Sequence, residues 1–359
     1  MPKLKTILLN TLPKHFPVNK FFLPSTFFLA LLLAAFTFQK SATKKPDGYR
    51  IAFYNCENFF DTINDLDVQD EEFTPAGKDQ WTSVRYQTKV EHLAKVISSI
   101  APDFIGLSEV ENKNVLKDLV KNVQLLPFNF EIVHINSPDP RGIDVAFLYR
   151  KDKFNLIGYH AIHVSLDDDT AFRTRDILQV EGTVANHDTV CFFINHWPSR
   201  RGGAEQSEPK RIAAAAALRS AVNQFAMAHP SAEIIVMGDL NDNPDNKSVH
   251  MILQADSNVV SEKNSSLFNP SFLIHTRTKT GSLYYNGSQD LFDQIIISDN
   301  LVKKNGGKEP VYSDAKIFRP DWLFKTNDKG ASEPWRTYEG VKYSGGYSDH
   351  LPAYVQLKL

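Results

Sequence analysis

Apolar runs separated by polar turns recur along the chain after residue 50, and their spacing distinguishes helices from strands. In 84–100, Val90, Leu93 and Ile97 recur at the three- to four-residue spacing of an amphipathic helix. Shorter runs of consecutive apolar residues are typical of buried strands. The pattern predicts helices at 84–100, 116–123, 209–228 and 248–253. It predicts strands at 51–54, 104–107, 129–134, 145–149, 157–163, 178–184, 190–194, 234–237, 295–298 and 353–357.

Two polar stretches interrupt this alternation in the second half of the chain. Residues 256–290 are rich in loop-forming residues, and 299–346 contain repeated glycine and proline. Because such residues favour turns, both stretches are expected to be loops. Residues 299–346 are the expected seat of substrate specificity.

Several neighbouring predicted strands lie too close in sequence for a helical crossover between them. Parallel neighbours need a connection of about a dozen residues or more, so the sheets are expected to be mixed or antiparallel, with helices outside. No break in composition interrupts 50–359, which predicts one domain there, preceded by a polar linker at 43–49.

Residues 1–42 differ from the rest. Several lysines precede an apolar run whose uninterrupted part, 27–38, has the length of a signal-peptide core and is short for a membrane span. Ser41 and Ala42 could mark a cleavage site. We expect a signal peptide or an uncleaved signal anchor, an exported catalytic part, and membrane contact only through this segment.

Composition restricts the function classes only weakly. The chain has 359 residues, a net charge of −2, 23% charged and 42% hydrophobic residues, which is ordinary for a soluble globular protein. Near-neutral charge argues against broad electrostatic binding of nucleic acid or membrane, although it does not exclude a local basic groove. Cys56 and Cys191 lie in apolar runs and are expected to be free, and the protein is expected to be a monomer.

Polar side chains gather where predicted strands end or begin, which predicts one site assembled from several strand ends. Asn, Asp and Glu oxygens suit a hard ion such as Mg²⁺, and the absence of a cysteine cluster argues against structural zinc. Glu111 is a weaker second candidate ligand after Glu109, because both would share a face if the strand continued. The main candidates are Asn55, Glu109, His196, Asp239, Asn241, Asp293, Asp349 and His350.

The motifs around these residues occur in the order found in one known family. They are Tyr54-Asn55 with Glu57, Gly106-Leu107-Ser108-Glu109-Val110, Asn195-His196-Trp197, Gly238-Asp239-Leu240-Asn241, Asp293-Gln294-Ile295-Ile296 and Ser348-Asp349-His350. On these motifs, residues 50–359 resemble the endonuclease/exonuclease/phosphatase superfamily, which includes pancreatic deoxyribonuclease. The resemblance implies an α/β fold, a four-layer α/β/β/α sandwich with two mixed, mainly antiparallel sheets.

The resemblance also assigns roles around the ion and the attacking water. Glu109 would be the main metal ligand, with Asn55 beside it and Asp349 also facing the metal. Asp239 would position or deprotonate the attacking water, and Asn241 would hold a phosphate oxygen.

Further roles concern the phosphate. His350, paired with Asp293, would contact the scissile phosphate or assist proton transfer. His196 would stabilise a phosphate oxygen, with Asp144 as its orienting partner. Two loop arginines near the strand ends, Arg175 and Arg200, are expected to contact substrate phosphates, because guanidinium groups suit phosphate oxygens.

The sequence therefore predicts an exported, Mg²⁺-dependent hydrolase of phosphodiester bonds, with a nuclease as the leading interpretation and Mn²⁺ or Ca²⁺ as alternative ions. Its partner would be nucleic acid or another phosphodiester. A phosphatase or phospholipase C-like enzyme on inositol phosphates or sphingomyelin is the alternative, and a non-catalytic binding module is a further one. Residues 256–346 lack an obvious basic run, which weakens the nucleic-acid case, and lack a long apolar segment, which weakens the lipid case.

Overall fold

A computed structural model of the protein describes residues 48–184, 189–258, 265–285, 287–302, 312–327 and 330–357. Residues 47–359 form one compact unit. The expected signal segment at 1–42 and most of the expected linker at 43–49 lie outside the described residues, so export stays a prediction. In the part of the chain that is described, no helix is long and apolar enough to cross a membrane.

The first sheet has six strands in the order β14-β19-β1-β2-β4-β3. Strands β1 and β2 run parallel, and the other neighbouring pairs run antiparallel. Both β1 and β2 are buried along almost their whole length because both faces of this sheet are covered. The strands are β1 (Tyr49–Phe59), β2 (Phe104–Val110), β3 (Phe130–His134), β4 (Asp144–Arg150), β14 (Tyr312–Ile317) and β19 (Ala353–Leu357).

The second sheet has seven strands in the order β5-β6-β7-β8-β13-β10-β9. The pairs β7–β8 and β9–β10 are parallel and the others antiparallel, so both sheets are mixed and mainly antiparallel, as predicted. The strands are β5 (Asn155–Ile162), β6 (Ile177–Thr183), β7 (Thr189–His196), β8 (Glu233–Asp239), β9 (Ala255–Asp256), β10 (Leu267–Phe268) and β13 (Asp293–Ser298).

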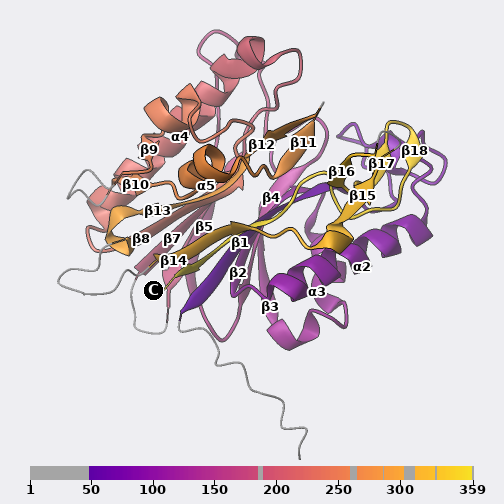
Figure 1. Ribbon diagram of the computed structural model, residues 1–359, viewed down its shortest axis with the longest axis horizontal. Coiled ribbons are helices and arrows are strands. Elements are labelled where there is room, and N and C mark those ends of the chain that lie inside the picture. The colour runs from indigo at the N-terminus through magenta and orange to yellow at the C-terminus, as the bar shows by residue number, and fades with distance from the viewer. Residues whose placement is uncertain are drawn as a thin grey trace, which may run out of the picture. The chain divides into compact units, whose positions relative to one another are not determined.

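Helices cover the outer face of each sheet (Figure 1). Helices α2 (Ser83–Ile100) and α3 (Lys113–Lys121) pack on the first sheet, and α4 (Ala204–Ala228) packs on the second. Thr82 caps α2 by accepting a hydrogen bond from the Arg85 backbone N–H, and Ala101 ends the helix in the left-handed conformation. The predicted four-layer α/β/β/α sandwich is thus confirmed.

The two sheets face each other across a buried core rich in phenylalanine. Phe104 and Phe147 of the first sheet lie with their ring centroids 5.1 Å and 4.7 Å from that of Phe192 in the second. All three rings are fully buried, and such close packing resists sliding of one sheet over the other. The ends of strands in different sheets are therefore held at fixed separations. The predicted free thiols, Cys56 and Cys191, are free and buried.

The prediction that 299–346 is a loop was wrong for its middle. Tyr312–Ile317 forms β14, which pairs with β19 at an edge of the first sheet. An edge strand needs little apolar sequence, which is why the pattern missed it. Farther along lie two hairpins, β15 (Phe324–Thr326) with β16 (Ser332–Pro334) and β17 (Tyr338–Glu339) with β18 (Lys342–Tyr343).

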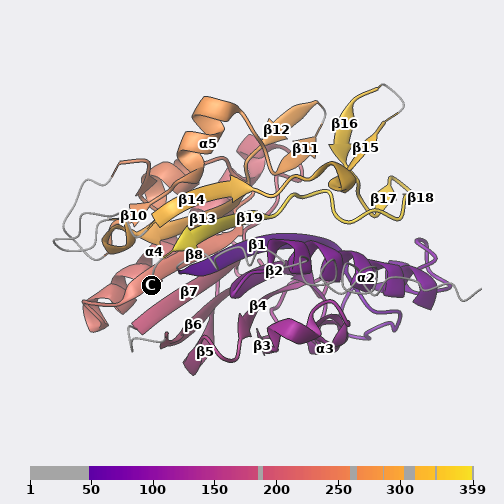
Figure 2. The ribbon, with the colours of Figure 1, turned by 60° about the horizontal axis from the view of Figure 1, so that its bottom comes forward.

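Residues 256–290 also contain elements that the loop prediction left out. Besides β10, they form helix α5 (Ser271–Thr278) and a hairpin of β11 (Leu283–Tyr285) and β12 (Ser288–Asp290). Figure 2 shows this hairpin and the two C-terminal hairpins projecting from the same end of the sandwich. Leu283 forms an isolated bridge with His350, so the β11–β12 hairpin borders the region where the polar strand ends lie.

Candidate active site

Strand direction brings the polar ends of the first sheet together. Because β1 and β2 are parallel, Asn55 and Glu109 lie near the same end of their strands. Strand β19 runs antiparallel to β1, so the chain that enters it, with Asp349 and His350, lies at that end too. The strand ends on this side of the first sheet therefore carry the predicted metal ligands and one histidine.

The second sheet presents its polar residues in the same way. Strands β7 and β8 are parallel and end at His196 and Asp239, which are register partners. Strand β13 runs antiparallel to β8 and begins at Asp293, the register partner of Asp239. Residues far apart in the sequence thus meet at these strand ends of the two sheets, which together form the catalytic edge.

Asp239 lies at the centre of the site and is 2% exposed. Its Oδ2 accepts a hydrogen bond from Asn55 Nδ2 at 3.0 Å, and its Oδ1 accepts one from the Asn241 backbone N–H at 3.0 Å. The same Oδ2 lies 3.6 Å from His196 Nε2 and 3.7 Å from His350 Nε2. One carboxylate therefore joins both sheets and both predicted catalytic histidines.

The two imidazoles differ in charge. His350 Nδ1 donates to Asp293 Oδ2 at 2.7 Å. Burial lowers the pKa of His350, but the Asp293 and Asp239 carboxylates outweigh burial and hold that pKa well above the usual histidine value. Burial, together with the positive charge of Arg175, holds the pKa of His196 well below it. The surroundings therefore shift the pKa values of the two imidazoles in opposite directions, although Asp239 and Glu109 also lie within 4 Å of His196 Nε2.

Burial also raises the pKa of Asp239, to about 6. The positive charge of His350 opposes this rise, and the Asp293 carboxylate reinforces it. Asp239 is thus a stronger base than an ordinary carboxylate, yet still mainly ionised at neutral pH.

Glu109 leaves the regular strand geometry. Its φ is +58°, and the register of β2 against β4 shifts between Ser108 and Val110. Its Oε2 accepts a hydrogen bond from the Asn58 backbone N–H at 2.8 Å, and its Oε1 lies 3.9 Å from His196 Nε2. The bulge aims the carboxylate across the gap between the sheets.

This bulge overturns the expectation that Glu111 shares a face with Glu109. The strand does not continue: β2 ends at Val110, and the left-handed Glu109 breaks the alternation. Glu111 instead accepts a hydrogen bond from the Asp61 backbone N–H at 2.5 Å, and burial raises its pKa to about 8.

The predicted pairing of Asp144 with His196 is wrong. Asp144 Oδ2 lies 2.9 Å from His134 Nε2, and its Oδ1 accepts from the Ser137 backbone N–H at 2.7 Å. His196 Nδ1 is buried and has no hydrogen-bond partner among the described residues. Asp144 and His134 belong to the neighbouring strands β4 and β3, so the Asp144 carboxylate bonds to a neighbour within its own sheet.

Arg175 and Arg200 both hold loops through contacts within the protein. Arg175 is buried, forms a 2.9 Å ion pair with Asp139 and donates to the carbonyl oxygens of His196 and Trp197.

Arg200 donates to the Asn241 carbonyl oxygen, to the Asp242 carboxylate and to the Asn246 side-chain amide oxygen. These contacts fix the segments that follow β7 and β8. Buried Arg175 is therefore not placed to contact a phosphate, whereas the contact predicted for Arg200, whose side chain is 27% exposed, stays a prediction.

A charged group beside the predicted metal ligands escaped the sequence analysis. Arg336 Nη2 donates to Asp349 Oδ2 at 2.5 Å, and its Nε lies 3.5 Å from Glu57 Oε1. Lys89 of α2 is 1% exposed; burial lowers its pKa, and the carboxylates of Glu57, Asp349 and Glu109 oppose that shift. Lys89 stands four residues before Leu93 on the apolar face of its helix. A charged residue on an apolar face was the sequence signal that could have identified Lys89 as part of the site.

The donor chemistry of the site fits a hard divalent ion. Asn55, Glu109 and Asp349 carry oxygen donors of the kind that Mg²⁺ prefers. Asp239, Asp293 and His350 also bring ligand atoms within 4.8 Å of one another.

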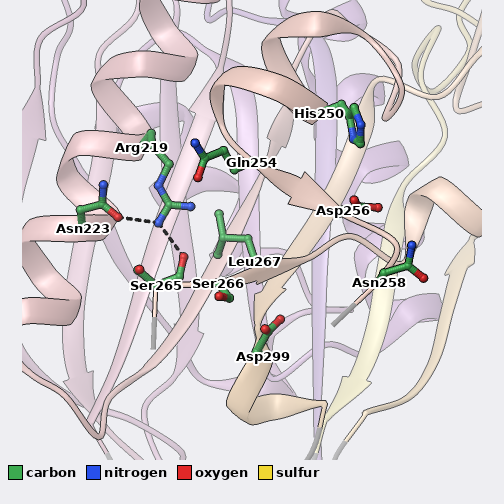
Figure 3. Close-up of a pocket in the computed structure, with 10 residues that line it drawn as sticks. All are labelled: Arg219, Asn223, His250, Gln254, Asp256, Asn258, Ser265, Ser266, Leu267 and Asp299. Carbon is green, nitrogen blue, oxygen red and sulfur yellow. Dashed lines mark hydrogen bonds between the residues drawn. The ribbon is translucent and has the colours of Figure 1, made fainter. Parts of the chain in front are cut away.

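A polar cavity of about 570 Å³ opens at the other end of β13 (Figure 3). Ser298 pairs there with Leu267, which lines the cavity, whereas Asp293 begins the strand at the catalytic edge. Arg219 donates to Asn223 Oδ1 and to the carbonyl oxygens of Leu253 and Ser265. Its contacts hold the wall of the cavity, which is separate from the catalytic edge.

The fold and the site define a phosphoesterase of the α/β/β/α class. A model of the "Endonuclease/Exonuclease/phosphatase family" matches residues 50–359, and the chain belongs to that family. No curated protein matches the chain.

Solved structures share the fold at low sequence identity. Truncated Caenorhabditis elegans TDP2 is 15% identical with a TM-score of 0.53, over 86% of this chain and 97% of that one. The human Nocturnin catalytic domain is 14% identical with a TM-score of 0.52, over 86% and 93%. The mannosyl-6-phosphatase Bt3783 of Bacteroides thetaiotaomicron is 16% identical with a TM-score of 0.53, over 86% and 99%. At such identities the likeness concerns the fold alone.

Proposed function

We propose that the protein is a divalent-metal-dependent phosphodiesterase, with nucleic acid as the first substrate class to test. The observation that carries the proposal is the buried Asp239 carboxylate between two imidazoles whose pKa values are shifted in opposite directions, beside hard oxygen donors. A base, an acid and charge stabilisation are what hydrolysis of a phosphate ester requires.

Each group has a part that follows from its charge state. Asp239, with a pKa of about 6, accepts a proton from the attacking water. His350, whose pKa Asp293 raises, donates its proton to the leaving oxygen of the phosphate ester, which departs as an alcohol. His196 donates its Nε2–H to a phosphoryl oxygen, which a neutral imidazole can do. Asn241 lies beside Asp239; its Nδ2 donates one N–H to the Trp197 carbonyl oxygen at 2.9 Å and has a second N–H to hold the phosphate.

Glu109, Asn55 and Asp349 would hold the ion. When bound, a Mg²⁺ ion neutralises the charge that develops on the phosphoryl oxygens. The Glu109 bulge and the contact of Asp349 with Arg336 orient two of these donors before any ion arrives.

A phosphatase acting on a compact phosphomonoester is the second candidate. A nuclease tracks a polyanion with several cationic contacts. Arg175 and Arg200 are engaged inside the protein, whereas Arg336, whose side chain is 41% exposed, is a guanidinium that reaches the rim of the site. A small phosphorylated substrate needs no more than one such contact.

Replacing His350 by alanine tests the site. We expect His350→Ala to lower kcat by about 10²–10⁴-fold, because a positioned proton donor contributes that much. His160→Ala is the matched control, because His160 is exposed on β5, outside the site. Full activity in purified His350→Ala would contradict the assignment.

The substrate class follows from parallel assays of the wild-type chain. Plasmid DNA, RNA, sphingomyelin, inositol phosphates and a sugar phosphate are incubated with Mg²⁺, Mn²⁺ or Ca²⁺, and with EDTA. Hydrolysis of DNA or RNA supports the leading proposal, and release of phosphate from the sugar phosphate alone supports the second. Cleavage that persists in EDTA would defeat the metal requirement.

A further inference from the structure

A second group of carboxylates lies outside the catalytic edge. Asp65, Asp70 and Glu111 each bring a carboxylate oxygen within 4.8 Å of the others. Asp70 is 1% exposed and Glu111 5%, whereas Asp65 is exposed. The two aspartates lie in the segment 60–72 that follows β1, and the glutamate follows β2. The group thus joins two separate segments and opens to water on one side.

One oxygen of this group lacks a partner although it is buried. Asp70 Oδ2 accepts a hydrogen bond from the Asp65 backbone N–H at 3.0 Å. Among the residues that the structure describes, Asp70 Oδ1 has no hydrogen-bond partner, and it is shielded from solvent. Buried carboxylate oxygens are rarely left without a partner, so this oxygen indicates an absent ligand.

The group also lacks a counter-charge. Among the described residues, no lysine, arginine or histidine forms an ion pair with Asp65, Asp70 or Glu111. Glu57, another buried carboxylate nearby in the sequence, is paired with Arg336. Burying unpaired carboxylates together is costly unless a cation neutralises them.

We propose that Asp65, Asp70 and Glu111 form a second cation site, which binds Ca²⁺. Calcium accepts six to eight oxygen ligands in irregular arrangements, whereas Mg²⁺ demands near-octahedral geometry and dehydrates reluctantly. An irregular segment that supplies carboxylates, with water available on the side of exposed Asp65, suits the larger ion.

A bound cation would tie the segment 60–72 to the end of β2. Hydrogen bonds already anchor this segment at both ends: the Trp81 indole N–H donates to the Phe60 carbonyl oxygen at 3.0 Å, the Asp61 backbone N–H donates to Glu111, and the Gln69 backbone N–H donates to the Pro140 carbonyl oxygen at 2.8 Å. Glu111 stands two residues after Glu109, so the site fixes the backbone that carries the predicted metal ligand of the catalytic edge.

Thermal unfolding of the chelator-treated full chain, with and without CaCl₂, tests the proposal. We expect the wild-type Tm to rise with the logarithm of Ca²⁺ concentration, because an ion that binds only the folded state stabilises it in this way. Asp70→Asn in the Glu109→Gln background, which lacks the main predicted metal ligand of the catalytic edge, should abolish that rise. Asp67→Asn is the matched control: it makes the same change at an exposed position of the same segment and should keep the rise.

Binding of Tb³⁺, followed by its luminescence, measures the same site without unfolding and is expected to be lost when Asp70→Asn is added to Glu109→Gln. Glu109→Gln should keep both signals, which separates this site from the catalytic edge and from any failure of the proposed function. Should Asp70→Asn not fold, exposed Asp65→Asn replaces it. The proposal is overturned by a wild-type Tm that ignores Ca²⁺, by signals that persist when Asp70→Asn or Asp65→Asn is added to Glu109→Gln, or by their loss in Asp67→Asn or Glu109→Gln.

Discussion

Single residues at the catalytic edge owe their charge to neighbours that only the folded chain supplies. His196 and His350 are both buried and both lie near carboxylates. Asp293 and Asp239 raise the pKa of His350, whereas burial and the positive charge of Arg175 lower that of His196. Residue type and position relative to a strand end could be predicted from the sequence. The charge states could not, because they depend on contacts between strands of different sheets.

These charge states predict how activity depends on pH. Asp239 must be ionised to accept a proton, so kcat/KM should rise as pH increases through about 6. His350 must keep its proton, so the rate should fall again once pH exceeds its raised pKa. Initial rates measured across this range should give a bell-shaped profile, and Asp239→Asn should lose the acid limb together with the activity. A wild-type rate that stays level through pH 6 would show that Asp239 is not the base.

Partner choice is the part of the site that residue patterns missed. Asp144 and Arg175 were placed near the strand ends correctly, yet the first contacts His134 and the second contacts Asp139 and backbone carbonyls. A carboxylate or guanidinium bonds whichever groups the backbone brings within about 3 Å. That selection is made by sheet register, which an apolar pattern does not specify at strand ends.

At the scale of elements, long apolar runs were predicted well and weakly apolar edges were not. The helix at 84–100 and the strand at 234–237 correspond closely to α2 and β8. Strand β14 was missed because one buried face and a single neighbour suffice to hold an edge strand. Buried elements can therefore be predicted from the sequence more accurately than edge strands can.

The close approach of β7 and β8 gives a prediction at this scale. A Cβ on Gly238 would stand 2.5 Å from the Asn195 carbonyl oxygen and 2.6 Å from Asn195 Cβ. Gly238→Ala should therefore push the two strands apart, lower the free energy of unfolding by about 1–3 kcal/mol and displace Asp239, with a loss of activity. Urea unfolding and kcat measure the two effects.

Gly158→Ala on β5 is the control for this prediction, because nothing lies within 4 Å of a Cβ there. We expect the β5 variant to keep the activity of the wild type. Equal stability and activity in Gly238→Ala would mean that the strand ends are more tolerant than the contact distances indicate.

The whole molecule is needed to complete the site, because its parts come from both ends of the domain. Strand β19, close to the C-terminus, pairs with β1, the first strand. Ser348 donates its hydroxyl to the Asn55 carbonyl oxygen at 2.8 Å, and Thr337 donates its backbone N–H to Glu57 at 2.6 Å. Such distant pairings set the geometry of the site, and helix or strand patterns contain no record of them.

Lys89 connects these distant parts and provides the last prediction. Its Nζ donates to Thr337 Oγ1 at 2.7 Å and to the Tyr347 carbonyl oxygen at 2.8 Å, beside the Glu57 carboxylate. Lys89→Met leaves that buried carboxylate with less compensation, so unfolding should become easier by about 3–5 kcal/mol. Adding Glu57→Gln should restore part of the loss, since the two effects are coupled. Urea unfolding of the four chains measures this coupling, with Lys117→Met on the exposed face of α3 as the control. If Lys89→Met unfolds like that control, the buried ammonium does not hold the two ends of the domain together.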